Sequence, residues 1–491
     1  MVTGAHETRT KIVCTIGPSS RDPETLRDLI RQGMDVARIN FSHGTPEELS
    51  SMIRTVREVS ADLNMTVAVL ADLQGPKLRI GALRQPLELA QGDWLALTIH
   101  PADGEHRVIP LPHPELITGA RRGSNWLLDD GSIEFIIREV HPEAVIGEVL
   151  VGGVLRSRKG VHAPGATTRI TALTPKDRAD AALAVSEGVD YVGLSFVQSA
   201  EDLRELRRLL GGLPGGDGVH ILAKIEKREA LEALDEILEV SDAIMVARGD
   251  LGLEIPAEEV PVRQKEIVHA CHQEGVPVVV ATQMLESMIE APRPTRAEAS
   301  DVANAILDGS DAVMLSGETA IGRHPARAVA VMREISAKTE QGVQGPPRGS
   351  RPRQAETQIA DAVCEATARV ASAVGATLIA TVTSSGYTAR RVARERPRQP
   401  IVALTPDPVV RRQLALVWGV APFQIAPYTS ADEMLEGAER ALRESGCVQD
   451  GDIILLTAGL PIGGRGTTNL LKVHRIGESP FFPHRPSTDA V

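Results

Sequence analysis

Two stretches of the chain show the pattern that decides its fold: residues 221–226 read Ile-Leu-Ala-Lys-Ile-Glu, and residues 243–250 read Ala-Ile-Met-Val-Ala-Arg-Gly-Asp. In each, a short apolar run ends in charged side chains. Similar runs, separated by helical segments, occur at 12–16, 36–39, 67–70, 191–197, 221–225, 243–247, 276–281 and 312–315. Strands that alternate with helices predict parallel βαβ units. Eight is the number of strands that closes a (β/α)8 TIM barrel, so we predict an α/β chain built on that barrel.

The connection between the third and fourth runs is far longer than a crossover helix needs. Most of it, residues 82–162, is β-rich and carries turns such as Asp129-Asp130-Gly131. We expect a small β-barrel-like domain inserted after the third strand, acting as a lid over the catalytic end. After a Gly-, Pro- and Arg-rich linker near 341–356, runs at 376–383, 401–404 and 452–456 predict a C-terminal α/β domain. The expected domains are therefore 1–81 and 163–342 for the barrel, 82–162 for the lid and 355–478 for the C-terminal domain.

The bulk properties of the chain exclude several classes of protein. Its 491 residues are too many for one ordinary core. A net charge of −12 disfavours a general nucleic-acid binder, and an aromatic content of 2% disfavours a base-stacking surface. No apolar run is long enough for a membrane span and the N-terminus lacks the apolar region of a secretory signal, so we expect a cytoplasmic protein without a membrane partner. The four cysteines are widely separated and are expected to be reduced structural thiols.

Charged side chains at the predicted strand ends point to the site, because catalytic groups of this barrel come from the C-terminal ends of its strands. Lys224 and Glu226 are two residues apart and share a strand face. With Asp250 they offer one cation and two carboxylates, a set that suits Mg²⁺ when substrate oxygens and water complete the shell. Lys224 and Arg38 can supply the positive charge that phosphoryl transfer needs. The alternative for Glu226 is a structural ion pair with Lys224 or Lys227.

Two loops have backbone N–H groups suited to an anion. Gly249-Asp250-Leu-Gly252 follows a predicted strand and can hold a carboxylate. Residues 383–388, Thr-Ser-Ser-Gly-Tyr-Thr, lie between a strand and a helix and form a candidate phosphate nest. An ordinary capped helix start is the alternative reading of this second loop.

Several motifs together resemble one family. Thr10-Lys-Ile-Val-Cys-Thr-Ile-Gly-Pro-Ser, Arg38-Ile-Asn-Phe-Ser-His-Gly, Ala223-Lys-Ile-Glu, Ile244-Met-Val-Ala-Arg-Gly-Asp-Leu-Gly, Ala281-Thr-Gln-Met-Leu-Glu-Ser-Met and Met314-Leu-Ser-Gly-Glu-Thr-Ala are similar to pyruvate kinase signatures and occur in the family's order. Thr457-Ala-Gly-Leu-Pro and Gly466-Thr-Thr-Asn-Leu-Leu-Lys-Val resemble that family's last domain. The resemblance covers nearly the full chain and implies transfer of the phosphoryl group of phosphoenolpyruvate to ADP.

The resemblance also implies catalytic roles for individual residues. Lys224 matches the lysine that stabilises the phosphoryl group in flight, with Ser195 and Phe196 behind it. Arg38 and Arg79 match the two arginines near the transferred phosphate, and Thr282 matches the threonine beside the enolate. Gly249 and Asp250 match the cradle of the substrate carboxylate. Glu226 and Asp250 match the ligands of Mg²⁺, for which Mn²⁺ is an alternative.

Further positions follow from the same resemblance. Asn40, His43, Arg79 and Lys159 match nucleotide-side positions, and Asn40, Ser42 and Asp72 match ligands of a monovalent cation. The family uses the loop that contains Thr383, Ser384, Ser385, Gly386 and Thr388 for a phosphorylated allosteric effector. The resemblance also implies a homotetramer that works in glycolysis.

The chain departs from the family at the third strand. Many members read Asp-Thr-Lys-Gly-Pro-Glu-Ile-Arg there, whereas residues 72–79 read Asp-Leu-Gln-Gly-Pro-Lys-Leu-Arg. Lys77 thus stands in place of a glutamate and Leu73 in place of a threonine. Lys77 is expected to substitute for the monovalent cation, so that the enzyme does not require K⁺. The alternative is that Lys77 points to solvent or pairs with a carboxylate of the lid.

Two rival functions are consistent with parts of the pattern. Another barrel acting on pyruvate or its enolate, such as an aldolase or a phosphoenolpyruvate mutase, would use similar electrostatics but would need neither a nucleotide lid nor the C-terminal domain. A catalytically inactive sensor would use only the loop at 383–388, but it would not need Lys224, Glu226, Asp250 and Thr282. A P-loop ATPase is disfavoured because the chain has no Walker A pattern.

Overall fold

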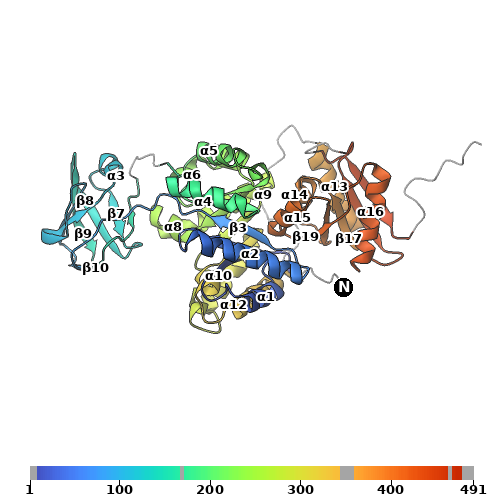
Figure 1. Cartoon of the computed structure of the whole chain (residues 1–491), viewed down its shortest axis with the longest axis horizontal. Helices are drawn as coiled ribbons and strands as arrows, with labels where there is room; N and C mark the ends of the chain where they lie inside the picture. Colours follow the sequence, from blue (N-terminus) through green and yellow to red (C-terminus); the bar gives the residue numbers. More distant parts are fainter. Residues whose placement is uncertain (1–7, 166–170, 343–358, 463–466, 478–491) are drawn as a thin grey trace, which may run out of the picture.

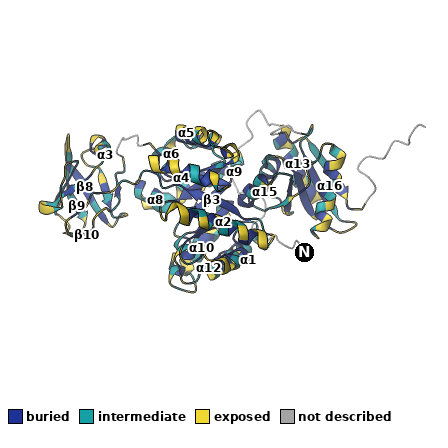
Figure 2. Ribbon diagram, viewed as in Figure 1, coloured by how far each residue is buried: buried dark blue, intermediate teal, exposed yellow. Residues whose placement is uncertain are grey.

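The computed structural model describes residues 8–165, 171–342, 359–462 and 467–477. Three bodies lie in a row, with the barrel in the middle, the inserted β-rich domain at one end and the C-terminal domain at the other (Figure 1). Buried residues concentrate on the strands, and exposed residues on the outer helix surfaces (Figure 2). Within the described segments, no helix combines the length and the apolar character needed to cross a membrane.

The central body is a closed barrel of eight parallel strands, as the sequence predicts. Its order around the barrel is β1-β16-β15-β14-β13-β12-β3-β2. The strands are β1 (Lys11–Ile16), β2 (Val36–Asn40), β3 (Ala68–Asp72), β12 (Tyr191–Leu194), β13 (His220–Ile225), β14 (Ala243–Ala247), β15 (Val278–Ala281) and β16 (Ala312–Leu315). The principal helices outside them are α1 (Pro23–Gln32), α2 (Pro46–Asp62), α4 (Pro175–Ser186), α5 (Ala200–Gly211), α7 (Leu234–Val240), α9 (Val260–Glu274), α10 (Arg296–Asp308) and α12 (Pro325–Glu340).

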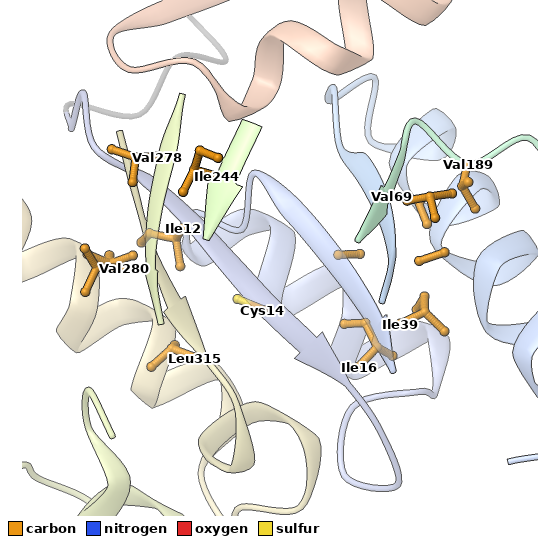
Figure 3. Packing of buried hydrophobic residues seen from close by; sticks show 14 of the residues in the cluster. Ile12, Cys14, Ile16, Ile39, Val69, Val189, Ile244, Val278, Val280 and Leu315 are labelled. Carbon is orange, nitrogen blue, oxygen red and sulfur yellow. The ribbon is translucent and has the colours of Figure 1, made fainter. Parts of the chain in front are cut away.

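Apolar side chains fill the barrel on both sides of its strands, because successive residues of a strand point to opposite faces. Ile12, Cys14 and Ile16 point outward and pack with Ile244, Val280 and other residues beneath the helices (Figure 3). Val13, between the first two, points inward and belongs to the interior cluster, which also contains Leu70, Leu222, Met245, Val279 and Met314. The four cysteines are buried free thiols, as expected.

The inserted domain is β-rich and its strands fall into two sheets. One has six strands in the order β11-β7-β8-β9-β5-β6, and the other pairs β10 with β4. The strands are β4 (Leu87–Leu89), β5 (Trp94–Thr98), β6 (Val108–Pro110), β7 (Asn125–Leu128), β8 (Ile133–His141), β9 (Ala144–Val151), β10 (Gly153–Leu155) and β11 (Val161–His162), with one short helix, α3 (Pro114–Gly119). Its core packs around Trp126 and Phe135, whose rings meet edge to face with centroids 6.0 Å apart.

The C-terminal domain is a five-stranded sheet in the order β19-β18-β17-β20-β21, with β21 antiparallel to β20. The strands are β17 (Leu378–Val382), β18 (Ile401–Thr405), β19 (Val420–Gln424), β20 (Ile453–Ala458) and β21 (Leu470–Arg475), and the helices are α13 (Ile359–Ala373), α14 (Tyr387–Arg394), α15 (Pro408–Gln413) and α16 (Ala431–Glu444). Separate apolar clusters cover the two faces, one with α13 and α14 and the other with α16.

A short turn of the C-terminal domain closes the N-terminal end of the barrel. This 3₁₀ turn, η5 (Leu414–Leu416), places Ala415 and Leu416 in the same cluster as the barrel interior. The buried Tyr191 hydroxyl donates a hydrogen bond to the Gln413 carbonyl at 2.7 Å, and the Arg412 Nε donates to Asp190 Oδ1 at 2.7 Å. The inserted domain lies at the opposite end of the barrel, which is the catalytic end (Figure 1).

Candidate functional site

A buried lysine organises the C-terminal rim of the barrel. The Lys224 Nζ lies 2.8 Å from Glu226 Oε1 and 3.3 Å from Asp72 Oδ1, and it donates a hydrogen bond to Ser195 Oγ at 2.8 Å. Ser195 in turn donates to the Leu73 carbonyl at 2.7 Å, which fixes the hydroxyl that faces the lysine. Three neighbouring strands thus hold one ammonium group in place. Of the two ion pairs considered for Glu226, the structure contains the one with Lys224. Lys227 pairs with Glu254 instead.

Arg38 is fixed beside this lysine. It lies on β2 next to β3, and its Nε donates to Asp72 Oδ2 at 2.7 Å while one terminal nitrogen donates to Thr15 Oγ1 at 2.9 Å. Both cations therefore share Asp72, which is 1% exposed. Two positive charges held by one buried carboxylate form a region prepared for a polyanionic substrate.

The charges of the cluster are set by burial and by these contacts. Burial acts to raise the pKa of Asp72, but Lys224 and Arg38 outweigh it and hold that pKa below its ordinary value. Burial acts to lower the pKa of Lys224, and the carboxylates of Asp72 and Glu226 outweigh it and raise that pKa well above the ordinary value. Burial raises the pKa of Glu226 against the opposing effect of Lys224, and the negative charge of Asp250 adds to the increase. The lysine is therefore a permanent cation, whereas Glu226 is a carboxyl group whose ionised form an added cation would favour.

The turn after β12 supports Glu226. The Phe196 N–H donates to Glu226 Oε2 at 2.8 Å, and Phe196 adopts a left-handed backbone with φ of 56° to do so. Gly75, with φ of 68°, lies directly against this turn, and a Cβ atom there would come within 2.8 Å of the Phe196 ring. The Gly-Pro step after β3 is therefore required by close packing of two rim loops.

Thr282 is held in a strained conformation just after β15. Its φ is 72°, a left-handed value that a β-branched residue rarely adopts. The Gly249 N–H donates to Thr282 Oγ1 at 2.8 Å, and Arg248 donates to the Thr282 carbonyl at 2.7 Å. Arg248 is anchored by Asp301 at 2.8 Å. Strain that surrounding contacts maintain in this way is typical of a functional position.

A cleft between the barrel and the inserted domain contains four of the remaining predicted residues. Its lining includes Lys77, Arg79, Lys159 and Asp250. Arg79 pairs with Gly160 of the inserted domain through a backbone bridge, and Lys159 forms an ion pair with Asp129 at 2.7 Å. Lys77 is exposed. Within the described part of the chain, the cations within 4.0 Å of Asp72 are Arg38 and Lys224, so Lys77 faces the cleft and does not touch the predicted monovalent-cation position.

The donor set fits a divalent cation that is shared with a substrate. Glu226 Oε1 and Asp72 Oδ1 are buried oxygens that make no hydrogen bond to the described residues, although both lie near Lys224. The search of the described residues found no group of three or more His, Cys, Asp and Glu side chains that could hold a metal alone. Asp250 lines the cleft, and a metal ion held by Glu226 and Asp250 would keep coordination positions for substrate oxygens and water, as Mg²⁺ prefers.

The positions matched to a monovalent cation and to the nucleotide lie at the end of β2. Asn40 is the register partner of Asp72 on β3, and its Oδ1 accepts a hydrogen bond from the Ser42 N–H at 3.0 Å. His43 is exposed three residues beyond the strand. The structure thus places Asn40, Ser42 and Asp72 on adjoining segments of the rim.

The predicted effector loop borders a second pocket, in the C-terminal domain. Thr383, Ser384, Ser385 and Thr388 line it, and Tyr428 lies among the other lining residues. Gly386 has φ of 76° and precedes the first turn of α14. Ser384 is exposed, whereas Thr388 is buried and its hydroxyl lies 2.8 Å from the hydroxyl of Thr468.

The sequence predicted no individual role for three residues that support the site. Thr15 orients Arg38, Arg248 holds Thr282, and Glu318 accepts hydrogen bonds from the Leu285 and Ser316 N–H groups, which ties the loop after β15 to β16. All three lie at or just beyond predicted strand ends, so their position was a signal, but their partners come from other strands.

Comparison with known proteins agrees with this geometry. A model of the pyruvate kinase barrel domain matches residues 7–329, and a model of the pyruvate kinase alpha/beta domain matches residues 361–474. The chain is 45% identical to a pyruvate kinase of Geobacillus stearothermophilus over 96% of this chain and 81% of the relative. It is 45% identical to a pyruvate kinase of Agrobacterium vitis over 95% of this chain and 97% of the relative. A crystal structure of a pyruvate kinase from Cryptosporidium parvum superposes with a TM-score of 0.89 at 35% identity, covering 97% of both chains. With this barrel, this rim and these relatives, the chain belongs to the pyruvate kinase family of phosphotransferases.

Proposed function

We propose that this chain transfers the phosphoryl group of phosphoenolpyruvate to ADP, giving pyruvate and ATP, as the final step of glycolysis. The observation that carries the proposal is Lys224, a buried ammonium fixed by Asp72, Glu226 and Ser195 at the catalytic rim of the barrel. A preorganised cation of this kind stabilises the charge that develops as the phosphoryl group moves.

The rim residues divide the reaction between them. Arg38 and Lys224 bind the phosphate of phosphoenolpyruvate, and the Gly249–Asp250 segment receives its carboxylate. The bond from the enol oxygen to phosphorus breaks, a bond from the ADP terminal phosphate oxygen to phosphorus forms, and an enolate remains. A proton then reaches the enolate carbon on the side where the Thr282 hydroxyl lies. Mg²⁺, or Mn²⁺ in its place, held by Glu226 and Asp250, would offset negative charge on the phosphate and enolate oxygens.

The nucleotide is assigned to the cleft beneath the inserted domain. Arg79 and Lys159 line that cleft, and Asn40 and His43 lie at the end of β2. Closure of the inserted domain over this cleft would exclude water from the transfer step.

We also propose that the enzyme needs no K⁺, since Lys77 carries a positive charge where many relatives carry a glutamate. Lys77 lines the cleft with Asp250 and makes no ion pair with a described carboxylate. Its ammonium is therefore available to the substrate phosphates rather than to Asp72. In the cleft this ammonium would take the place of a cation beside the substrate phosphates, and a K⁺ ion that approached it to about 4 Å would be repelled by on the order of 4 kcal/mol at an effective dielectric constant near 20.

Three further assignments complete the proposal. The pocket at Thr383–Thr388 takes a phosphorylated effector, because its hydroxyls and the N–H groups of the following helix can hold phosphate oxygens. The working form is a homotetramer. The enzyme acts in the cytoplasm.

One assay tests the central proposal. The purified chain is mixed with phosphoenolpyruvate, ADP and Mg²⁺, and pyruvate and ATP are measured separately, in a buffer of bulky organic cations with and without K⁺. Equal amounts of the two products, dependent on ADP, support a kinase. Pyruvate without ATP, or turnover that does not need ADP, would favour the other enolate-processing barrels. No turnover by the folded protein, together with binding of a phosphorylated metabolite, would favour a sensor.

A further inference from the structure

A small cavity lies between the N-terminal end of the barrel and the C-terminal domain, remote from both pockets described above. The barrel contributes the segment from Cys271 to Pro277, between α9 and β15, together with Asp311 before β16. The C-terminal domain contributes Arg390, Arg394 and Arg396, from α14 and the residues after it. In Figure 1, α9 and α14 meet at this border.

Arg396 is the least satisfied side chain of this cavity. It is 7% exposed, and one terminal nitrogen contacts the Gly309 carbonyl at 2.6 Å and Asp311 Oδ1 at 3.3 Å. Its guanidinium carbon lies 4.4 Å from the centre of the Trp418 ring. The other two nitrogens, Nε and Nη1, are buried and have no hydrogen-bond partner among the described residues. Such donors are costly to leave unpaired, because a buried charged group needs compensation.

The charges around the cavity do not balance. Four arginines lie near three carboxylates. Arg391 and Arg394 pair with Asp361 at 3.4 and 3.2 Å. Arg394 also pairs with Glu395 at 3.2 Å, and Arg396 pairs with Asp311. Arg390 forms no ion pair within the described chain and donates only to the Ser385 carbonyl, at 3.4 Å. The difference, four minus three, is one positive charge.

The other charged groups near these arginines do not cancel this charge. Asp242 acts on Arg390 electrostatically, but it pairs with Arg207 at 2.7 Å. His272, which also lines the cavity, is neutral because burial lowers its pKa to about 3. The backbone N–H of Arg9 donates to Glu340, and the Arg9 guanidinium donates to the Pro397 and Arg398 carbonyls. Arg9 and Glu340 therefore form a pair of opposite charges that leaves the difference unchanged.

We propose that this cavity binds one small monovalent anion of halide size, held by Arg396 and Arg390 across the junction between the barrel and the C-terminal domain. The available room corresponds to about one water molecule, so a phosphate ester is excluded, and a halide, which is somewhat larger than water, fits with a small outward shift of the lining side chains. One negative charge would restore local neutrality and occupy the open donors of Arg396. The anion would also link Asp311 and the start of β15 on the barrel to α14, whose preceding loop carries the effector residues. This inference does not depend on the proposed reaction.

Bromide locates the site directly. The full chain is crystallised in sodium bromide, and an anomalous difference map is calculated at the bromine edge. A peak within hydrogen-bond distance of Arg396 Nε or Nη1 is expected. A water molecule there, or no anomalous peak, would overturn the proposal whatever the variants do.

Chloride exchange tests the same site in solution. The ³⁵Cl line width of sodium chloride is measured with the wild-type chain, with Arg396→Gln, and with the matched control Arg323→Gln, whose exposed arginine pairs with Glu290 at the protein surface. We expect the wild type and the control to broaden the line, and Arg396→Gln to bind chloride about tenfold or more weakly. Arg390→Gln serves if Arg396→Gln does not fold, as judged by circular dichroism. Equal broadening by the wild type and the folded variant, or a bromide peak without broadening in solution (an adventitious ion only), would reject the site.

Discussion

Replacing Lys224 with methionine tests the central element of the site. Methionine keeps much of the apolar stem and removes the ammonium that lies 2.8 Å from Glu226 and 3.3 Å from Asp72. Loss of one preorganised charge from such a site costs about 3–4 kcal/mol of transition-state stabilisation, or roughly 200- to 800-fold in turnover. The substitution should also lower the free energy of unfolding, because it leaves two buried carboxylates with less compensation.

The size of the stability loss follows from the same distances. At an effective dielectric constant near 20, attraction over these separations is on the order of 5 kcal/mol for each carboxylate, and the desolvation of the ammonium offsets much of it. Breaking a buried pair by removing one partner costs about 3–5 kcal/mol. Protonation of Glu226, whose pKa burial already raises, would relieve part of this cost, so the loss should be smaller at acid pH.

Pyruvate formation by Lys224→Met is measured alongside urea unfolding and circular dichroism. Ser195→Ala is the matched control, because it removes the 2.8 Å hydrogen bond to Lys224 and keeps the charge. The control should lose only about 0.5–1.5 kcal/mol, or roughly two- to twelvefold in turnover. Wild-type turnover by folded Lys224→Met, or equal losses in both variants, would refute the assignment of Lys224 as the stabilising charge.

Four further outcomes are expected. The Mg²⁺ concentration for half activity should rise by up to about tenfold per pH unit as the pH falls below the raised pKa of Glu226, because the metal binds the ionised carboxylate. In Glu226→Gln this dependence on pH should disappear, and a variant that keeps it would contradict the ligand assignment. Thr282→Ala should lose about 100-fold in turnover while Thr282→Ser stays within about tenfold, because serine keeps the oxygen that accepts from Gly249 without the strained β-branch; similar turnover of the two would argue against a role for the hydroxyl. Lys77→Glu should create activation by K⁺ that the wild type lacks, and strong activation of the wild type would remove the basis of the K⁺ proposal. Ser384→Asp should abolish the response to phosphorylated effectors and keep basal turnover, because a carboxylate at this exposed position repels phosphate; if a screen of sugar phosphates and nucleotides leaves the wild-type substrate curve unchanged, the effector assignment fails.

The sequence predicted the barrel well because buried parallel strands leave a strong signal. All eight apolar runs became strands of one closed sheet, and most ends agree within two residues. The differences have local causes. The run at 276–281 becomes a strand only from Val278, since Pro277 has no N–H for the ladder. The run at 191–197 ends as a strand at Leu194, because Phe196 turns into a left-handed conformation that delivers its N–H to Glu226.

The edges of the C-terminal sheet were harder to predict. The strand β19 contains Pro422, which argues against a central strand, and it lies at the edge where proline is tolerated. At the other edge, β21 alternates weakly between apolar and charged residues and joins the sheet antiparallel. Neither strand has the continuous apolar run that marked the barrel strands.

Charged residues at strand ends identified the rim but not its connections. Lys224, Glu226 and Arg38 were recognisable because buried strands have no other need for such side chains at one end. Asp72, the carboxylate that Lys224 and Arg38 share, and the support of Thr15 depend on which strands become neighbours when the barrel closes. The orientation of Lys77 toward the cleft also depends on packing of the inserted domain, which no local pattern contains.

The turn at Leu414–Leu416 has a consequence for how the chain is made. Ala415 and Leu416 complete the apolar interior at the N-terminal end of the barrel, yet the ribosome adds them long after Leu315, the last residue of the last barrel strand. The nascent barrel therefore exposes apolar side chains at its N-terminal end until the C-terminal domain emerges. Until then the Tyr191 hydroxyl also lacks the Gln413 carbonyl as its hydrogen-bond acceptor. Exposed apolar surface of this kind invites chaperone binding and aggregation. The order of synthesis thus makes the C-terminal domain a late folding component of the barrel, so truncation before residue 414 should impair the solubility of the catalytic body itself.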